Sequence, residues 1–224
     1  MSVKNINKLK DVCKSGLCTR CGTCVGLSGG RISFEDKLGI CLPKIPDDLD
    51  ETIAARIWAG CSAQQVSFPE LNRFVFGKGS ERHPYLGYYN GLFIGNCSDD
   101  DLRKKCSSGG IITLSLLRLL ETRKITGAVV LGMNPEKPWE TLPFIAKTKD
   151  EIISAAGSKY YLSPMNIILD EIERHNGSLA YVGLPCQVHS IQKLKIVGDP
   201  TVQKIEYIIG LFCGNILLFS SIYQ

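Results

Sequence analysis

The second half of the chain alternates short apolar stretches with amphipathic ones. Apolar runs at residues 88–95, 128–133, 179–182 and 205–212 predict strands, and the run at 128–133 is apolar on both faces, as in a covered sheet. Residues 109–123 predict a helix because Ile112, Leu116, Leu119 and Leu120 fall on one face. Further helices are predicted at 148–157, from a capping box, at 163–175, after Ser-Pro, and at 185–194.

This rhythm of strands and helices predicts an α/β domain, with a mixed sheet covered by helices, over residues 81–224. Residues 1–80 differ, since they hold most of the clustered cysteines and many turn residues, and they predict a small ferredoxin-like module. Within this module residues 41–46 predict an extended segment, and residues 49–60 predict a helix capped by Asp47 or Asp48. Residues 217–224 follow a strand with no closing helix, as at a truncated or frayed end.

Composition and charge exclude several classes of protein. The chain has 224 residues, 44% of them hydrophobic, and a net charge of +4, so it is globular and has no basic footprint for nucleic acid. The run 103–105 is interpreted as a solvated helix face, and the apolar stretch 205–219 is interrupted by polar residues, which argues against a membrane span. With no export signal at the N-terminus, the chain is expected to be cytoplasmic. Ten cysteines in a reducing compartment indicate metal or redox chemistry rather than disulfides.

Three thiols recur at every third residue, at Cys18, Cys21 and Cys24. A loop with this spacing brings three sulfurs to one point, and Gly22 permits the tight backbone path that such a loop requires. Structural zinc sites more often use paired Cys-x-x-Cys knuckles separated by a longer insert. The spacing therefore predicts an iron-sulfur cluster, with zinc as the competing metal.

The fourth ligand of this cluster must come from elsewhere in the chain. A bacterial ferredoxin run would continue with Cys-Pro, but Ser28 and Gly29 stand at those positions. Cys61 is the first candidate and Cys41 the second. Cys13 with Cys18 and Cys21 also matches the spacing of plant-type 2Fe-2S proteins, although that arrangement leaves Cys24 unused; otherwise Cys13 is interpreted, with Cys97, as a small buried hydrophobe.

Four short segments in the second half carry small residues near the ends of predicted helices or strands. The segment 106–110, Cys-Ser-Ser-Gly-Gly, leads into a helix whose positive end can accept a phosphate, and the segment 157–161 adds Lys159 and two tyrosines. Together these segments suit a dinucleotide. Residues 183–187, Gly-Leu-Pro-Cys-Gln, and 212–214, Phe-Cys-Gly, lie at strand ends, where open α/β sheets bind their ligands.

The order of these five motifs resembles the coenzyme F420 hydrogenase/dehydrogenase beta subunit family. The resemblance implies a coenzyme F420-dependent-type oxidoreductase subunit, an iron-sulfur flavoprotein in which FAD exchanges a hydride with coenzyme F420 or a similar carrier. FAD would then pass single electrons to a 4Fe-4S cluster and on to a redox partner protein or subunit. Residues of two kinds are implied: cluster ligands at Cys18, Cys21 and Cys24, completed by Cys61, and cofactor-binding residues at Ser107, Ser108, Gly109, Gly110, Gly157, Ser158, Lys159, Tyr160, Cys186 and Gln187.

Some assignments within this interpretation stay open. Cys186 and Cys213 serve either a second cluster or the flavin pocket, and Lys159 is the residue expected to stabilise negative charge on a phosphate or on reduced flavin. No side chain is assigned a catalytic role, because the flavin needs no protein nucleophile. The alternatives are a non-catalytic iron-sulfur partner protein that lacks flavin, and a thiol module that binds metal without redox work.

Overall fold

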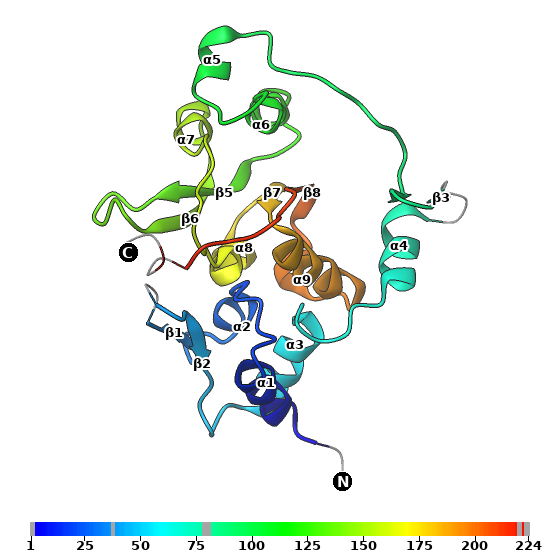
Figure 1. Ribbon diagram of the computed structural model, residues 1–224, viewed down its shortest axis with the longest axis vertical. Coiled ribbons are helices and arrows are strands. Elements are labelled where there is room, and N and C mark those ends of the chain that lie inside the picture. The colour runs from blue at the N-terminus through cyan, green and yellow to red at the C-terminus, as the bar shows by residue number, and fades with distance from the viewer. Residues whose placement is uncertain (1–2, 37–38, 78–81, 219–220, 222–224) are drawn as a thin grey trace.

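A four-stranded mixed sheet, in the order β6-β5-β7-β8, forms the frame of the second half of the chain (Figure 1). The computed structural model describes residues 3–36, 39–77, 82–218 and 221. In it β5 (Gly127–Met133) pairs antiparallel with β6 (Thr141–Ala146) and parallel with β7 (Leu179–Gly183), which pairs parallel with β8 (Ile205–Gly210). The predicted mixed α/β architecture is therefore confirmed.

Side chains that alternate along the strands separate two hydrophobic cores, because successive residues of a strand point to opposite faces. Val130 and Ala180 pack with α6 (Ile111–Glu121) and α7 (Lys149–Ser154) on one face of the sheet. Val129 and Tyr181 pack on the other face with three elements: the 3-10 turn η1 (Met165–Ile168), α8 (Leu169–Arg174) and α9 (Pro185–Ile196). Helices therefore cover both faces, which explains why β5 is apolar throughout.

Among the described residues, the first eighty positions contribute to the core that contains Val129 and Tyr181. They contain helices α1 (Asn5–Lys14), α2 (Thr23–Gly26), α3 (Glu51–Gly60) and α4 (Phe68–Phe76), and a hairpin of β1 (Ser33–Glu35) and β2 (Leu42–Lys44). Ile6, Leu9 and Ile57 belong to the same buried cluster as Leu169 and Ile191. Figure 1 accordingly shows α2 and α3 directly beneath α8 and α9, with α1 below them. The cysteine-rich segment is thus packed against the α/β domain.

Most of the predicted elements are confirmed, with shifted boundaries. The helix at 111–121, the strands β5, β7 and β8, the helix α9 and the capping box of Thr148 with Glu151 all occur. The helix predicted from Ser163-Pro164 begins as the 3-10 turn η1, and Ser163 makes no capping hydrogen bond to it. The helix α3 begins later than expected, and the predicted cap at Asp47 or Asp48 is wrong. Asp50 caps this helix by accepting from the amides of Thr52 and Ile53.

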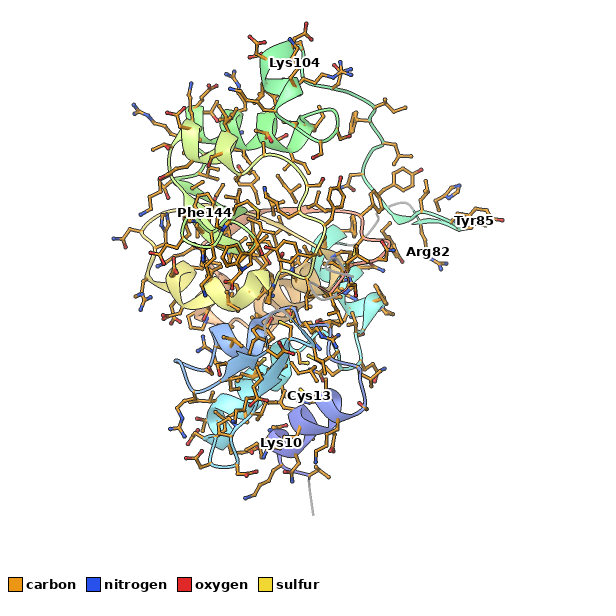
Figure 2. The ribbon with its side chains drawn as sticks, turned by 60° about the vertical axis from the view of Figure 1, so that its left-hand side comes forward. Lys10, Cys13, Arg82, Tyr85, Lys104 and Phe144 are labelled. Atoms are coloured by element: carbon orange, nitrogen blue, oxygen red, sulfur yellow. The ribbon has the colours of Figure 1, made fainter. Side chains whose placement is uncertain are left out.

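The strand predicted at residues 88–95 is wrong. Only Gly87–Tyr88 forms a strand there, β4, paired with β3 (Arg82–His83) in a small hairpin. Figure 2 shows Arg82 and Tyr85 on this hairpin, which projects from the body of the protein. Residues 91–97 have no regular structure, and Leu92, Phe93 and Ile94 are exposed by 68%, 95% and 106%. An apolar run makes a strand only where a partner strand supplies hydrogen bonds, and the four-stranded sheet provides none here.

Several elements were not predicted. The strand β6 contains Pro143, which weakens a strand pattern but is tolerated at the edge of a sheet. The helix α1 is mostly polar, since it buries only Ile6 and Leu9. Also not predicted are α2, α4, β1, β3 and the 3-10 turn η2 (Pro200–Val202). The short helix α5 (Asp100–Lys104), capped by Asp99, carries Arg103 and Lys104 of the run interpreted as a solvated helix face, and both are exposed. Among the described residues, no helix is both long and apolar enough to cross a membrane, and the predicted end at 217–224 lies largely outside the described residues.

An ion pair joins the cysteine-rich segment to the α/β domain. Arg56, on α3, donates to both carboxylate oxygens of Asp199 at 2.6 Å and 2.8 Å, and the Thr201 amide donates to the same carboxylate at 3.0 Å. The Asp199 side chain is 5% exposed. Burial alone would raise the pKa of Asp199, but these hydrogen bonds outweigh burial and lower it. The carboxylate is therefore charged in the folded protein and depends on its donors.

We expect Arg56→Leu to lower the free energy of unfolding by about 1–3 kcal/mol near neutral pH, because it leaves a buried carboxylate without its main donor. The pKa of Asp199 is lower in the folded than in the unfolded chain, so the pair stabilises fully above the unfolded pKa. Its contribution is lost as the pH falls through the folded pKa. Urea denaturation across this range should show the difference between wild type and variant shrinking in acid. Arg31→Leu, which removes an exposed ion pair with Asp48, is the control and should change stability by about 0.5 kcal/mol or less.

Candidate functional site

Five thiols line one small cavity in the cysteine-rich segment. Cys13 lies near the end of α1 (Figure 2), Cys18 and Cys21 on the following loop, Cys24 on α2, and Cys61 immediately after α3. The rest of the lining is largely apolar and includes Leu9, Val12, Phe34, Pro43 and Ile57. The structure thus brings together all four thiols predicted as ligands. Cys41, the second candidate for the fourth ligand, is buried but does not line this cavity.

Cys13 is the residue that sequence reasoning set aside. Its spacing to Cys18 and Cys21 indicates a ligand only in the plant-type 2Fe-2S pattern, which leaves Cys24 unused. In the structure Cys13 shares a hydrogen bond with Cys18, which raises the pKa of Cys13 and lowers that of Cys18. The signal that could have found it is its position at the end of a helix that leads directly into the thiol loop.

Backbone amides donate to three of the cavity's sulfurs. The amide of Arg20 donates to Cys18, that of Val25 to Cys24, and those of Ala63 and Gln64 to Cys61. Burial nevertheless raises the pKa of Cys24 and of Cys61. These thiols therefore favour the protonated state until a cation replaces their protons, as metal binding does.

The thiol loop follows a strained path that fits against η1. Gly22 has φ +94°, and a Cβ at this position would lie 2.8 Å from the amide nitrogen of Ile167. The amide of Asn166 donates to the carbonyl oxygen of Cys21 at 2.9 Å. On the other side, Arg20 donates through Nε to the carbonyl oxygen of Ile40 at 2.8 Å. The predicted role of Gly22 in a tight turn is therefore matched by both its backbone angle and its close contact.

A zinc ion and a 4Fe-4S cluster require different arrangements of their cysteine ligands. Within the described ranges, no three His, Cys, Asp or Glu side chains are arranged to hold a single metal ion. A structural zinc ion needs four ligands at about 2.0–2.3 Å from one centre. In a 4Fe-4S cluster each thiolate binds a different iron, so its four sulfurs surround a wider volume.

A second cavity, of about 740 Å³, opens at the ends of the parallel strands. Its walls come from residues 106–113, 155–161, 182–184 and 211–217, so the segments predicted to surround a flavin lie together. The hydroxyl oxygen of Ser107 accepts from the amide of Ser158 at 2.6 Å and connects two of these segments. Gly110, with φ +74°, precedes α6, whose N-terminus borders the cavity. The volume lies within the range of about 300–1,000 Å³ that is usual for ligand sites.

Lys159 lines this cavity but already has partners. Its Nζ donates to the carbonyl oxygens of Ala155, Ala156 and Gly157 at 2.6 Å, 3.2 Å and 3.0 Å, at the C-terminal end of α7. Burial lowers the pKa of Lys159. Tyr160, also in the lining, is 72% exposed. Lys159 therefore fixes the turn that carries it while it places a positive charge beside the cavity.

Only part of the motif after β7 lines the large cavity. Gln187 lines the large cavity, accepts from the amide of Leu184 at 2.8 Å and donates to the carbonyl oxygen of Ser163 at 2.9 Å. Cys186 lines neither cavity. Burial, together with nearby Cys21 and Cys213, raises the pKa of Cys186 to about 11. Cys213 itself lines the large cavity.

Sequence reasoning missed residues 215–217 as part of the cavity wall. The motif that ends at Gly214 was predicted to lie at a strand end. The amide of Leu162 donates to the carbonyl oxygen of Leu217 at 2.9 Å, which holds this segment beside residues 157–161. Their position after the last parallel strand is the signal that could have identified them.

The fold and the two cavities define a mixed α/β domain with a ligand cavity at its strand ends and a thiol-lined cavity beside it. Two family models match the chain: coenzyme F420 hydrogenase/dehydrogenase beta subunit, N-terminal part, at residues 92–170, and the C-terminal part at residues 176–223. The chain belongs to this family, so the resemblance noted in the sequence is confirmed.

Similar proteins include the coenzyme F420-dependent sulfite reductase of Methanocaldococcus jannaschii, 28% identical over 92% of this chain and 32% of that protein. The coenzyme F420 hydrogenase subunit beta of Methanosarcina barkeri is 33% identical over 58% of this chain and 46% of its own length. Among solved structures, the F420-reducing [NiFe] hydrogenase complex of Methanosarcina barkeri matches with a TM-score of 0.56 and 28% identity, over 64% of this chain and 50% of the matched chain. The chain thus spans about a third to a half of these relatives.

We expect Gly22→Ala to destabilise the protein more than Gly29→Ala. Both glycines have positive φ, so alanine carries about 1–2 kcal/mol of backbone strain at either position. A Cβ at Gly29 meets nothing within 4 Å, whereas one at Gly22 strikes the η1 backbone. The backbone strain is common to both variants, so the difference between their free energies of unfolding, measured by urea denaturation, reports the contact at Gly22. Equal losses would contradict the close packing of the thiol loop on η1.

Proposed function

We propose that this chain carries the FAD and 4Fe-4S sites of an oxidoreductase subunit that exchanges a hydride with coenzyme F420 or a similar carrier. The observation that carries the proposal is the pairing of two sites: a cavity surrounded by thiols, and a dinucleotide-sized cavity at the strand ends. The names of the relatives, which include F420-dependent hydrogenase and sulfite reductase proteins, support F420 as the hydride carrier. A redox partner subunit and a cytoplasmic location belong to the same proposal.

The donor set of the smaller cavity suits an iron-sulfur cluster. Cys18, Cys21, Cys24 and Cys61 would be the ligands, because thiolates are the ligands that iron-sulfur clusters use. The amides that donate to Cys18, Cys24 and Cys61 would stabilise these thiolates, and such donors also help to set a cluster's potential. Cys13 would remain a protonated neighbour that donates to Cys18.

The larger cavity suits FAD. Small residues at 107–110 allow a phosphate to approach the N-terminus of α6, where backbone amides and the helix dipole favour an anion. Lys159 adds a positive charge nearby, and Tyr160 offers an aromatic face. A bound flavin takes up two electrons as a hydride and releases them singly, which couples a hydride carrier to a one-electron cluster. The chain supplies the position of each group and the exclusion of water between them.

Each of Cys18→Ser, Cys21→Ser, Cys24→Ser and Cys61→Ser should lose most of the iron and acid-labile sulfide of the wild type. The wild-type protein, purified without oxygen, should contain about four of each per chain. Cys97→Ser is the matched control, because Cys97 is 1% exposed and belongs to the other hydrophobic core. Iron and sulfide assays, with electron paramagnetic resonance after reduction, provide the measurement.

Cys13→Ser and Cys41→Ser should keep their iron. If Cys13→Ser loses iron while Cys24→Ser keeps it, the plant-type 2Fe-2S ligand set replaces the one proposed. A colourless protein that contains zinc and no iron would contradict the proposal as a whole.

We expect Ser107→Ala to weaken FAD binding about 5- to 30-fold, because the Ser158 amide loses its acceptor and the two segments around the flavin are no longer connected. Ser154→Ala removes a hydroxyl that donates only to the Glu151 carbonyl within α7, outside the cavity lining, and should bind FAD as the wild type does. Titration of flavin-stripped protein with FAD, followed by fluorescence, measures both affinities. Failure of the wild type to bind FAD would support the alternative, an iron-sulfur partner protein without flavin.

A further inference from the structure

Four buried polar side chains lie beside the thiol loop, and no predicted site includes them. Thr23 is 1% exposed, and Asn166, Tyr181 and Ser190 are each fully buried. They come from α2, η1, β7 and α9, so four separate elements contribute one polar group each. Buried polar groups cost free energy unless they are paired, which makes their hydrogen bonds informative.

The donor and the acceptor can be assigned for each hydrogen bond that Asn166 makes in this group. The Nδ2 atom of Asn166 lies 3.3 Å from the backbone carbonyl oxygen of Gln187, which only accepts, and this contact identifies Nδ2 as the amino group. The same Nδ2 donates to the Thr23 hydroxyl oxygen at 2.9 Å. On its other side, Asn166 accepts from the Tyr181 hydroxyl through Oδ1.

Because the Thr23 oxygen accepts from Asn166, the hydrogen of its hydroxyl remains to be donated. The Cys21 sulfur lies 3.3 Å from that oxygen. The Ser190 hydroxyl oxygen lies 3.6 Å from the same sulfur. A thiolate bound to iron has no hydrogen of its own, so both hydroxyls then act as donors to it. The chain of donors from Tyr181 through Asn166 and Thr23 therefore ends on one of the proposed ligands.

Donors to a cluster's sulfurs raise its reduction potential, because reduction adds negative charge that the donors stabilise. The amides described above donate to Cys18, Cys24 and Cys61, whereas the hydroxyls of Thr23 and Ser190 contact the sulfur of Cys21. Cys21 and Cys213 both help to raise the pKa of Cys186, and Cys213 lies in the wall of the large cavity.

We propose that Thr23 and Ser190 set the reduction potential of the cluster by donating to the Cys21 sulfur, and that Asn166 is a positioning residue that orients the Thr23 hydroxyl toward it. The inference rests on the proposed function, since it requires a cluster at Cys21. It assigns a tuning role to residues that neither bind metal nor touch flavin. A purely structural role, in which Asn166 only holds η1 against α2, predicts changes in stability without a change in potential.

The experiment is a redox titration of the loaded protein, monitored by electron paramagnetic resonance of the reduced cluster. Thr23→Val keeps the shape of the side chain and removes the hydroxyl, and it should shift the potential to a more negative value. Thr23→Ser keeps the donor and should retain the wild-type potential. Asn166→Leu should shift the potential in the same direction as Thr23→Val. The double variant with Thr23→Val and Asn166→Leu should have a potential no more negative than that of Thr23→Val alone, because Asn166 acts through Thr23.

Thr201→Val is the matched control. Thr201 is as buried as Thr23, but its hydroxyl contacts Arg56 and Glu173 rather than the thiol loop. This variant should lower stability and leave the potential unchanged. The same titration of Ser190→Ala provides a second test that leaves Thr23 and the loop sequence intact, and it should also give a more negative potential.

A Thr23→Val protein with full iron content and an unchanged potential would overturn the inference. If Thr23→Val fails to hold a cluster, an unchanged potential in Ser190→Ala overturns it instead. Neither result bears on the proposed function, which is contradicted separately by a wild-type protein that contains no iron and sulfide.

Discussion

The contact between the thiol loop and η1 is the interaction on which the position of the thiol-lined cavity depends. The Asn166 amide donates to the Cys21 carbonyl oxygen, and the absence of a side chain at Gly22 lets the Ile167 backbone approach the loop. A local loop of this kind has few apolar residues of its own, so its shape must be imposed by what it packs against. Because η1 leads into α8 in the main hydrophobic core, the position of the cysteines is fixed by the folding of the α/β domain.

The elements that sequence predicted best are those with strong local signals. The helix α6 has an apolar face, α7 has a capping box, and β5 is apolar on both faces because the sheet separates two cores. The strand predicted at 88–95 had the same apolar signal but no partner in the sheet, and it is an exposed irregular segment. The edge strand β6 was not predicted, because Pro143 weakens its sequence pattern. It nevertheless forms, because it pairs with β5. Pairing between distant segments is the information that local patterns lack.

The site residues, too, could be predicted where they lie on one short segment and not where they come from separate elements. The thiols at 18, 21 and 24 and the small residues at 107–110 were recognisable because each motif lies on one short segment. Cys61 was predicted from its position after a predicted helix, whereas Cys13 was not preferred because its plant-type spacing to Cys18 and Cys21 leaves Cys24 unused. Thr23, Asn166, Tyr181 and Ser190 could not have been found from the sequence, since they meet only when four separate elements pack together.

The helix α9 shows how one element can serve two sites. Gln187 and Ser190 are three residues apart, so they lie on the same face of the helix. Gln187 lines the large cavity, and Ser190 reaches the Cys21 sulfur. The helix α9, which begins just after β7, therefore contacts the surroundings of both cavities. For the proposed transfer of electrons between two bound groups, holding both groups against one such element would fix their separation without requiring any residue to move.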